Sequence, residues 1–370
     1  TELFRLKHSA EEQGFLTCMG RCDIDLDSGD IEYTDVLLYI LDLLVNQASA
    51  AGLKISERVV SKIEHYWNSD TELVKTISMQ GETELSFGVG VEAGVRKVLS
   101  LLANVRGILK NSAESKREIR LRIEPRSNEL LHQIKDVIEE VKRQLAEKER
   151  PEIPFVILDG LDKIPLGQAR KIFHENGSRF QGLPIHLLVT FPISLTYTPE
   201  YKDIQVWFPN PEKLPMIKIR NWQCGAYQQD YTEGVKTVQS IIGKRAELSL
   251  FSENALLDLI CYTGGYIRDL FRCICDAALR ARLRKSAIIE QEDVKKALAV
   301  LESDINGRYN DELIGRMEDI YKGNKHVSSS EEITVLLQIG AVLEYNGTRW
   351  CDLHPLVEKW LVENNKITES

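Results

Sequence analysis

The sequence Phe155-Val-Ile-Leu-Asp-Gly-Leu-Asp-Lys163 says the most about how this chain is built. Its continuous apolar run is typical of a short strand that is buried in a parallel sheet. The strand ends on Asp159, and a second carboxylate, Asp162, follows three positions later. In open α/β sheets, ligands bind at the carboxyl ends of such strands. The stretch therefore predicts an acidic site at a sheet edge, and the alternative is an ordinary Asp-Gly turn after an apolar strand.

The segments around this strand favour an α/β core. Residues 127–149 have apolar side chains at three- and four-residue spacing, with Lys and Glu on the other face, which predicts an amphipathic helix. Ile185 to Thr190 and Phe15 to Met19 are further apolar runs that predict strands. An acidic run follows the earlier of these strands: Asp23, Asp25 and Asp27. A helix followed at once by a buried strand is the pattern of α/β proteins.

Length and composition limit the class of protein. A chain of 370 residues predicts two or three domains. No run of 18 apolar residues and no secretory pattern occurs, so we expect a cytoplasmic protein with no membrane contact. The seven cysteines form no paired CxxC set with zinc-site spacing, which fits reduced thiols in the cytoplasm. A net charge of −9 argues against coating nucleic acid by bulk charge and leaves a local basic patch open.

Changes of pattern along the chain predict three parts. An α/β core covers residues 1–220 and contains an unusual insertion at about 80–125, rich in glycine and valine at its start. This insertion is a hairpin, a mobile segment or a packing surface, and it lacks the G-x-G-x-x-G spacing of a dinucleotide site. Residues 221–305 are helical. Residues 306–370 combine helices with a hairpin about Asn346-Gly347, which suggests a winged-helix-like domain.

Three features are suited to binding a nucleoside triphosphate. A carboxylate at the end of a strand, Asp159, can hold Mg²⁺. Asp162 can polarise a water molecule, or it is simply a favourable charge at the start of a helix. Thr190 can contact a γ-phosphate from the neighbouring strand, or it reflects the strand propensity of threonine. Gly264-Gly265-x-x-Arg268 opens a helix, and Arg268 is either a phosphate ligand or a surface arginine.

Together these features resemble the AAA+/STAND class of P-loop ATPases, of the prokaryotic signalling and defence type near the origin-recognition group. Five stretches carry the resemblance: Phe155 to Lys163, Leu187-Leu-Val-Thr190, Gly264 to Leu270, Ile289 to Ala297, and Val342 to Leu356. The resemblance implies an α/β P-loop NTPase core with a parallel sheet at 1–220. It further implies an α-helical lid at 221–305 and a C-terminal winged-helix-like domain at 306–370.

The same resemblance implies ATP and Mg²⁺ as cofactors and assigns roles to single residues. Asp159 organises the metal through its water shell, and Asp162 orients or activates the attacking water. Thr190 senses the γ-phosphate, and Arg268 ties the lid to it. Modules of this class assemble side by side, which implies a homo-oligomer with an arginine supplied in trans, for which Arg220 and Arg245 are candidates.

The chain departs from the pattern of the class at several places. No G-x-x-x-x-G-K-[S/T] loop occurs, and Gly243-Lys244-Arg245 has no glycine-rich stretch before it. Thr1-Glu-Leu resembles the residues that follow such a loop, so we expect the loop just upstream and Thr1 at the nucleotide. Lys163 stands where related motifs carry an acid, and Phe191-Pro192 where signalling relatives place an arginine. These departures suit slow hydrolysis.

The prediction is therefore an ATP-binding and ATP-hydrolysing switch that oligomerises or changes conformation to control a partner or effector protein, in prokaryotic signalling or antiviral defence. One alternative is a DNA-engaged ATPase, an origin-binding or transposition regulator, supported by the winged helix and a basic run. That run is more simply a solvated helix face; it comprises Arg280, Arg282, Arg284 and Lys285. The other alternative is a scaffold that does not use nucleotide.

Overall fold

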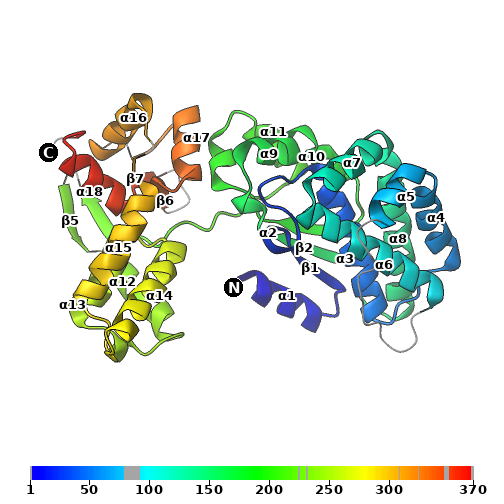
Figure 1. Cartoon of the computed structure of the whole chain (residues 1–370), viewed down its shortest axis with the longest axis horizontal. Helices are drawn as coiled ribbons and strands as arrows, with labels where there is room; N and C mark the ends of the chain where they lie inside the picture. Colours follow the sequence, from blue (N-terminus) through cyan, green and yellow to red (C-terminus); the bar gives the residue numbers. More distant parts are fainter. Residues whose placement is uncertain are drawn as a thin grey trace. The chain divides into compact units, whose positions relative to one another are not determined.

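The chain folds into two compact units (Figure 1), which are described separately. The computed structural model describes residues 2–78, 92–223, 226–230, 232–307, 309–323, 325–345 and 350–367. The first unit comprises Thr1–Leu195 and Glu200–Asn210, and the second comprises Thr196–Pro199 and Pro211–Ser370. The regions predicted as a lid and as a winged-helix-like domain thus both lie in the second unit.

The first unit is built on a parallel sheet. Among the described residues its strands are β1 (Thr17–Arg21), β2 (Phe155–Asp159) and β3 (His186–Val189), in the order β1-β2-β3. The predicted strand at 155–159 is confirmed, and Val156 to Leu158 are fully buried, as expected for a central parallel strand. All three strands therefore end at one edge, where β1 places Arg21 directly opposite Asp159. The architecture of this unit is α/β.

Helices surround this sheet and form most of the unit. The most buried is α3 (Tyr33–Ala50), which packs against β1, α6 (Ala93–Asn111) and α8 (Ser127–Glu147). Its apolar residues fill nearly every turn, so few of its side chains reach solvent. The other helices of the unit are α1 (Glu2–Glu12), α2 (Cys22–Asp25), α4 (Glu57–Asn68), α5 (Thr71–Ser78), α7 (Ala113–Ile123), α9 (Leu166–Arg170), α10 (Gly177–Gln181) and α11 (Tyr201–Trp207).

The predicted insertion at about 80–125 is helical where it is described. Residues 79–91, with most of the glycine- and valine-rich sequence, lie outside the described residues. From Ala93 onward the chain forms α6 and α7, and Val95, Val98 and Leu102 of α6 are buried. Of the three interpretations left open, a packing surface fits this helical part.

The second unit has two hydrophobic cores, one around a group of helices and one around a hairpin. Its helices are α12 (Thr232–Gly243), α13 (Glu253–Tyr262), α14 (Ile267–Leu283), α15 (Gln291–Ile305), α16 (Asp311–Tyr321), α17 (Glu331–Gln338) and α18 (Pro355–Glu363). The strands β6 (Val342–Tyr345) and β7 (Trp350–Leu353) pair antiparallel, as predicted, and the turn between them lies outside the described residues. A second antiparallel pair, β4 (Arg220–Gln223) and β5 (Ala226–Asp230), was not predicted.

Candidate functional site

Asp159 lies at the carboxyl edge of the sheet, where ligands of parallel sheets bind. Its side chain is 22% exposed, and its Oδ2 lies 3.5 Å from Nε of Arg21. Arg21 ends the neighbouring strand, so the ion pair joins the ends of β1 and β2. The carboxylate is therefore accessible and already has a cation beside it.

Thr190 lies next to Asp159, at the end of the third strand. Its backbone N–H donates to the oxygen of Leu158 at 3.0 Å, which continues the pairing of β3 with β2. Its hydroxyl oxygen accepts a hydrogen bond of 2.9 Å from the N–H of Gly160. The structure thus brings two predicted site residues, Asp159 and Thr190, to one edge and fixes the threonine hydroxyl against the turn after Asp159.

Gly160 allows the strand end to approach the segment after β1. Its φ is +91°, a left-handed conformation that L side chains rarely adopt. A Cβ at this position would lie 2.5 Å from Oδ1 of Asp23. Any larger residue would therefore push Asp23 away from the edge of the sheet.

Asp23 connects the two cations of the edge and was not among the predicted site residues. The guanidinium of Arg21 donates to both of its carboxylate oxygens, at 3.1 and 3.0 Å, and Nζ of Lys163 lies 2.5 Å from its Oδ2. Burial alone would raise the pKa of Asp23, but the hydrogen bonds from Arg21 and Lys163 lower it to about 2. The acidic run after β1 was the available signal, but its partner Lys163 is 140 residues away in the sequence.

The low pKa of Asp23 predicts a pH dependence. A carboxyl whose pKa falls from 3.8 to about 2 on folding contributes stability that is complete above pH 3.8 and is lost as the pH falls through 2. We expect Asp23→Asn to lower the free energy of unfolding by about 2 kcal/mol at pH 7 and much less at pH 2. Urea unfolding of both proteins at several pH values measures this difference. An equal loss at every pH would show that charge on Asp23 contributes nothing.

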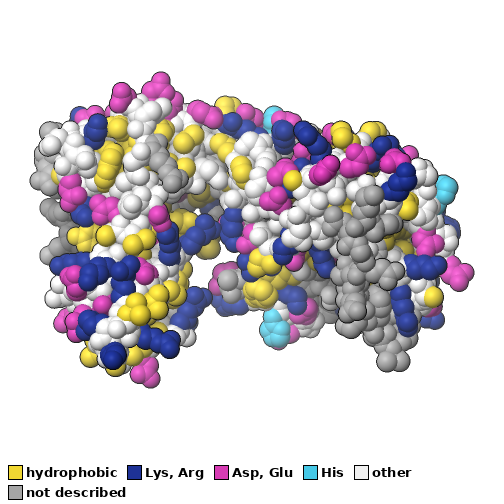
Figure 2. Space-filling view, viewed as in Figure 1, with side chains coloured by type: hydrophobic (Ala, Val, Ile, Leu, Met, Phe, Trp, Pro, Cys, Tyr) yellow, Lys and Arg dark blue, Asp and Glu magenta, His cyan; other side chains and the backbone are white. Residues whose placement is uncertain are grey.

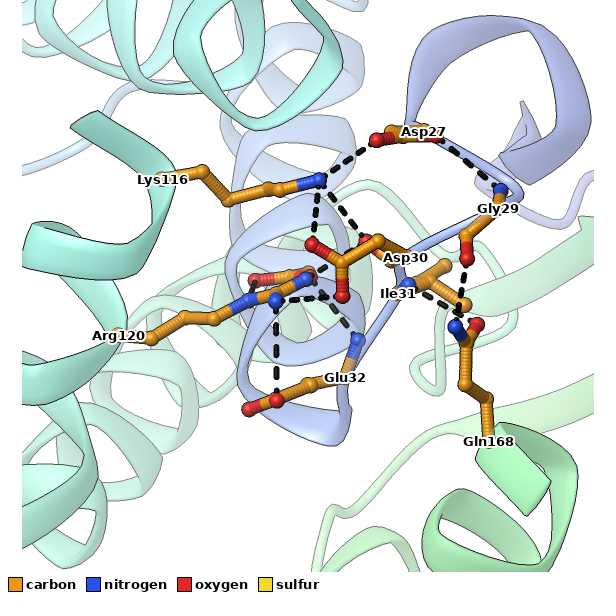
Figure 3. A network of polar contacts seen from close by, with 9 residues as sticks. Asp27, Gly29, Asp30, Ile31, Glu32, Lys116, Arg120 and Gln168 are labelled. Atoms are coloured by element: carbon orange, nitrogen blue, oxygen red, sulfur yellow. Dashed lines mark hydrogen bonds and ion pairs between the residues drawn. The ribbon is translucent and has the colours of Figure 1, made fainter. Parts of the chain in front are cut away.

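A network of ion pairs holds the loop that follows this acidic edge (Figure 3). Lys116 of α7 is 2% exposed, and its Nζ lies 2.7 Å from Asp27 and 2.8 Å from Asp30. Arg120, one turn further along α7, contacts Asp30 at 2.9 Å and forms a short ion pair with the buried Asp35. Helix α7 therefore binds the loop through buried cations.

Gln168 of α9 holds the same loop from another side (Figure 3). Its side-chain nitrogen donates to the oxygen of Gly29 at 2.7 Å, and its side-chain oxygen accepts from the N–H of Ile31 at 3.1 Å. Helix α9 begins shortly after Asp162, so the loop is fixed both to the insertion and to the segment that follows β2. The acidic edge is thus built on a rigid support.

Of the other predicted site residues, Asp162 and Arg268 are described and Thr1 is not. Asp162 is half-buried in the 3₁₀ turn Leu161–Lys163, and Thr1 lies outside the described residues. Arg268 is exposed in the second unit, with its guanidinium 5.7 Å from the centre of the Tyr266 ring. No predicted role of these residues is tested by their positions.

The two candidate arginines for action in trans both have contacts within the second unit. Arg220 forms an ion pair of 3.1 Å with Glu358, and the guanidinium of Arg245 lies 4.4 Å from the centre of the Phe271 ring. These contacts hold both side chains against their own unit.

Gly264 and Gly265 lie at a crowded junction within the second unit. Their φ values are +64° and +73°. A Cβ on Gly265 would lie 1.9 Å from the backbone oxygen of Ile217, and one on Gly264 would lie 2.8 Å from Cδ of Pro355. The hydroxyl of Tyr345 donates to the oxygen of Gly264 at 2.6 Å. The glycines therefore allow three distant segments to meet at the start of α14.

Comparison with known proteins adds no relative. Neither a protein-family model, nor a curated protein, nor a solved structure matches the chain. In the described part of the chain, no three His, Cys, Asp or Glu residues are grouped so that they could hold a metal ion. The helices of that part include none with the length and apolar character needed to cross a bilayer.

Proposed function

We propose that this chain is the core of a P-loop-type ATPase that acts as a nucleotide-gated switch. The observation that carries the proposal is the position of Asp159 and Thr190 at the carboxyl ends of the paired parallel strands β2 and β3, where the Thr190 hydroxyl accepts a hydrogen bond from the N–H of Gly160. A rigid carboxylate and a neighbouring hydroxyl at this position suit a metal–phosphate ligand. The family assignment rests on the sequence resemblance, and the arrangement of the sheet edge supports it.

The residues at the edge fit Mg²⁺ of the kind that accompanies a nucleotide. Mg²⁺ is usually bound by one or two carboxylates together with water and substrate phosphates, so one accessible carboxylate is sufficient. Asp159 provides that group, and its contact with Arg21 shows that a positive charge is tolerated there. When bound, Mg²⁺ would neutralise phosphate charge.

The protein's own groups would act by position and charge. Asp159 presents its carboxylate at the strand end, and Thr190 holds its hydroxyl beside the following turn. Asp162 would orient or activate a water molecule. Arg21 contacts both Asp23 and Asp159, so a ligand that binds Asp159 would change the ion pairs that Arg21 forms at this edge of the sheet. Differential binding to two arrangements of such an edge is what drives a switch.

The 370 residues contain no G-x-x-x-x-G-K-[S/T] loop, so the proposal rests on the sheet edge and not on a phosphate-binding loop. The sheet could accept a further strand. Within the described residues β3 pairs with β2 alone, and its apolar residues Leu187, Leu188 and Val189 are only half-buried. Parallel strands are normally covered on both faces and flanked by neighbours, so this open apolar edge supports a larger sheet.

A protein effector is a better partner for this switch than DNA. The order of α16, α17, β6, β7 and α18 is compatible with a winged-helix-like domain. However, Arg280 pairs with Asp276 at 3.0 Å and Arg284 with Asp293 at 2.8 Å, so half of the predicted basic run is neutralised. Assembly with further copies and a cytoplasmic location belong to the proposal.

The test is binding of Mg²⁺–ATP to the protein. At a hundredfold excess over Kd, a specific ligand stabilises a protein by about 2.7 kcal/mol. We expect that stabilisation to require Mg²⁺, and we expect Asp159→Asn to lower Mg²⁺-dependent turnover by about 100-fold. Thermal unfolding with and without nucleotide, together with phosphate release, measures both effects.

Asp136→Asn is the matched control, because Asp136 also forms an ion pair in the first unit, with Lys62 at 2.6 Å, but lies on α8. It should leave binding and turnover unchanged. A natural protein that shows no nucleotide-dependent stabilisation would instead be a scaffold, and unchanged turnover in Asp159→Asn would remove the proposed role of Asp159. Stabilisation by duplex DNA, steeply dependent on salt, would favour the DNA-engaged alternative.

A further inference from the structure

Helix α14 has two different faces. One is buried in the core of the second unit and comprises Leu270, Cys273, Ile274, Ala277 and Ala281. At 100° per residue, a second set of residues lies together on the opposite face. We call this set the α14 surface; it comprises Arg272, Cys275, Leu279, Arg282 and Leu283. The helix is thus buried on one side and exposes leucine, arginine and cysteine side chains on the other.

The α14 surface exposes large apolar side chains. Leu283 is 75% exposed and Leu279 is 55% exposed, and their spacing of four residues places them side by side. Ile288, in the loop that follows the helix, is 47% exposed. Figure 2 shows hydrophobic side chains with Lys and Arg around them where Figure 1 places α14. Adjacent leucines with this exposure are characteristic of a contact surface more than of a solvated helix face.

The charge around these leucines is positive, although the chain as a whole carries −9. The nearby acids are already engaged, since Asp276 pairs with Arg280, Asp293 with Arg284, and Asp304 with Arg272. In the described part of the chain, Arg282 and Lys285 form no ion pair. The apolar pair therefore lies beside uncompensated cations.

We propose that the α14 surface is a docking site for an acidic amphipathic helix of a partner protein. Two leucines at i and i+4 form a ridge that fits the groove of another helix, and apolar anchors at this spacing are how helices are recognised. Arg282 and Lys285 select acidic residues beside those anchors by charge complementarity. Nucleic acid fits less well, because its binding requires several cations facing phosphates and the centre of this surface is apolar. The proposal does not depend on nucleotide binding.

The experiment uses fluorescence anisotropy with synthetic helical peptides and the full chain. The probe has leucines at i and i+4 flanked by glutamates, and a matched peptide has lysines in place of the glutamates. We expect the acidic peptide to bind at least tenfold more tightly than the basic one and its affinity to fall with added salt. Equal binding of the two peptides would overturn the charge argument.

Variants locate the binding to α14. Leu283→Glu should weaken binding of the acidic peptide at least tenfold. Arg282→Glu should weaken binding of the acidic peptide and strengthen binding of the basic peptide. Leu121→Glu is the matched control, because Leu121 is a 61% exposed leucine of α7 in the first unit, and it should change nothing. Circular dichroism and thermal unfolding confirm that each variant is folded.

Three outcomes would contradict the proposal. The first is unchanged binding by Leu283→Glu, and the second is an equal loss in Leu121→Glu. The third is tighter binding of duplex DNA or of phosphatidylserine vesicles at the same salt concentration, with sensitivity to Leu283→Glu. That result would assign the α14 surface to nucleic acid or to a lipid surface.

Discussion

Arg120→Ala is expected to lower the free energy of unfolding of the first unit by about 3–5 kcal/mol, because it leaves a buried carboxylate without its partner. The Asp35 side chain is 2% exposed and that of Arg120 is 10% exposed. Arg120 also contacts Asp30 and the backbone oxygen of that residue. Amide hydrogen exchange over α3 and α7 reports this loss for the first unit separately.

The effect should depend on pH in a defined direction. Burial raises the pKa of Asp35 above 3.8, while Arg120 opposes that rise. A carboxyl whose pKa is raised on folding destabilises the fold at pH values above the folded pKa, and this destabilisation is absent below the pKa of the unfolded chain. The loss of unfolding free energy in Arg120→Ala should therefore be largest near pH 7 and smaller near pH 4.

Arg122→Ala is the matched control for this variant. Arg122 lies two residues further along the same helix, is 41% exposed and pairs with Glu118 at 2.8 Å. An exposed ion pair of this kind is screened by solvent and contributes little to stability. Losses of similar size in Arg120→Ala and Arg122→Ala would refute the importance of the buried network.

Gly265→Ala should destabilise the second unit by about 3 kcal/mol or more, since a positive φ and a steric clash act together. The φ is +73°, and the new Cβ would lie 1.9 Å from the oxygen of Ile217, where only a backbone movement can make room. Hydrogen exchange of α14 and of the β6–β7 hairpin measures the effect in the affected segments.

Gly307→Ala separates the effect of the positive φ from the effect of the steric clash. Gly307 also belongs to the second unit and has a φ of +89°, but a Cβ there meets no atom within 4 Å. The free energy of unfolding of Gly307→Ala should fall by about 1–2 kcal/mol, which is the cost of the backbone conformation alone. If the two variants were equally destabilised, the contact with Ile217 would carry no weight.

The parts of the fold that sequence reasoning predicts are those governed by local pattern. The strand at Phe155 to Asp159 and the helix predicted at 127–149, which is α8, appear at the predicted positions, because each has a clear apolar period and a clear end. Thr34, directly before the apolar run Asp35 to Asn46, is a residue type that favours a helix N-cap, but it does not cap α3. Glu32 is the N-cap and forms a capping box with Asp35, so the helix begins one residue before Thr34.

The errors arise where distant segments determine the structure. The sequence Met216 to Ile219 favours a short strand, yet within it only Met216 forms a bridge, to Tyr345 more than a hundred residues away. The four prolines of residues 198–215 favour a loop, but this segment contains α11. In the same way, the charged sequence of α7 indicates a solvated helix, and only the folded chain brings Lys116 to the acids after β1.

For the candidate site, the positions of its residues at the strand ends could be predicted from the sequence, and the side chains that surround them could not. The end of an apolar strand located Asp159, and the next apolar strand located Thr190. The partners Arg21, Asp23 and Lys163 come from segments up to 140 residues apart, and no local pattern connects them.

The junction at Gly264 and Gly265 has a consequence for the order in which the protein is made. Ile217 bonds to Gly265, Met216 bonds to Glu344, and Tyr345 bonds to Gly264. A ribosome that has completed α14 has not yet synthesised the hairpin that closes this junction. The early helices of the second unit must therefore wait, with incomplete packing, for about 70 further residues, from Leu283 at the end of α14 to Leu353 at the end of the hairpin. During synthesis, the early helices of the second unit therefore need protection from aggregation until the hairpin is made.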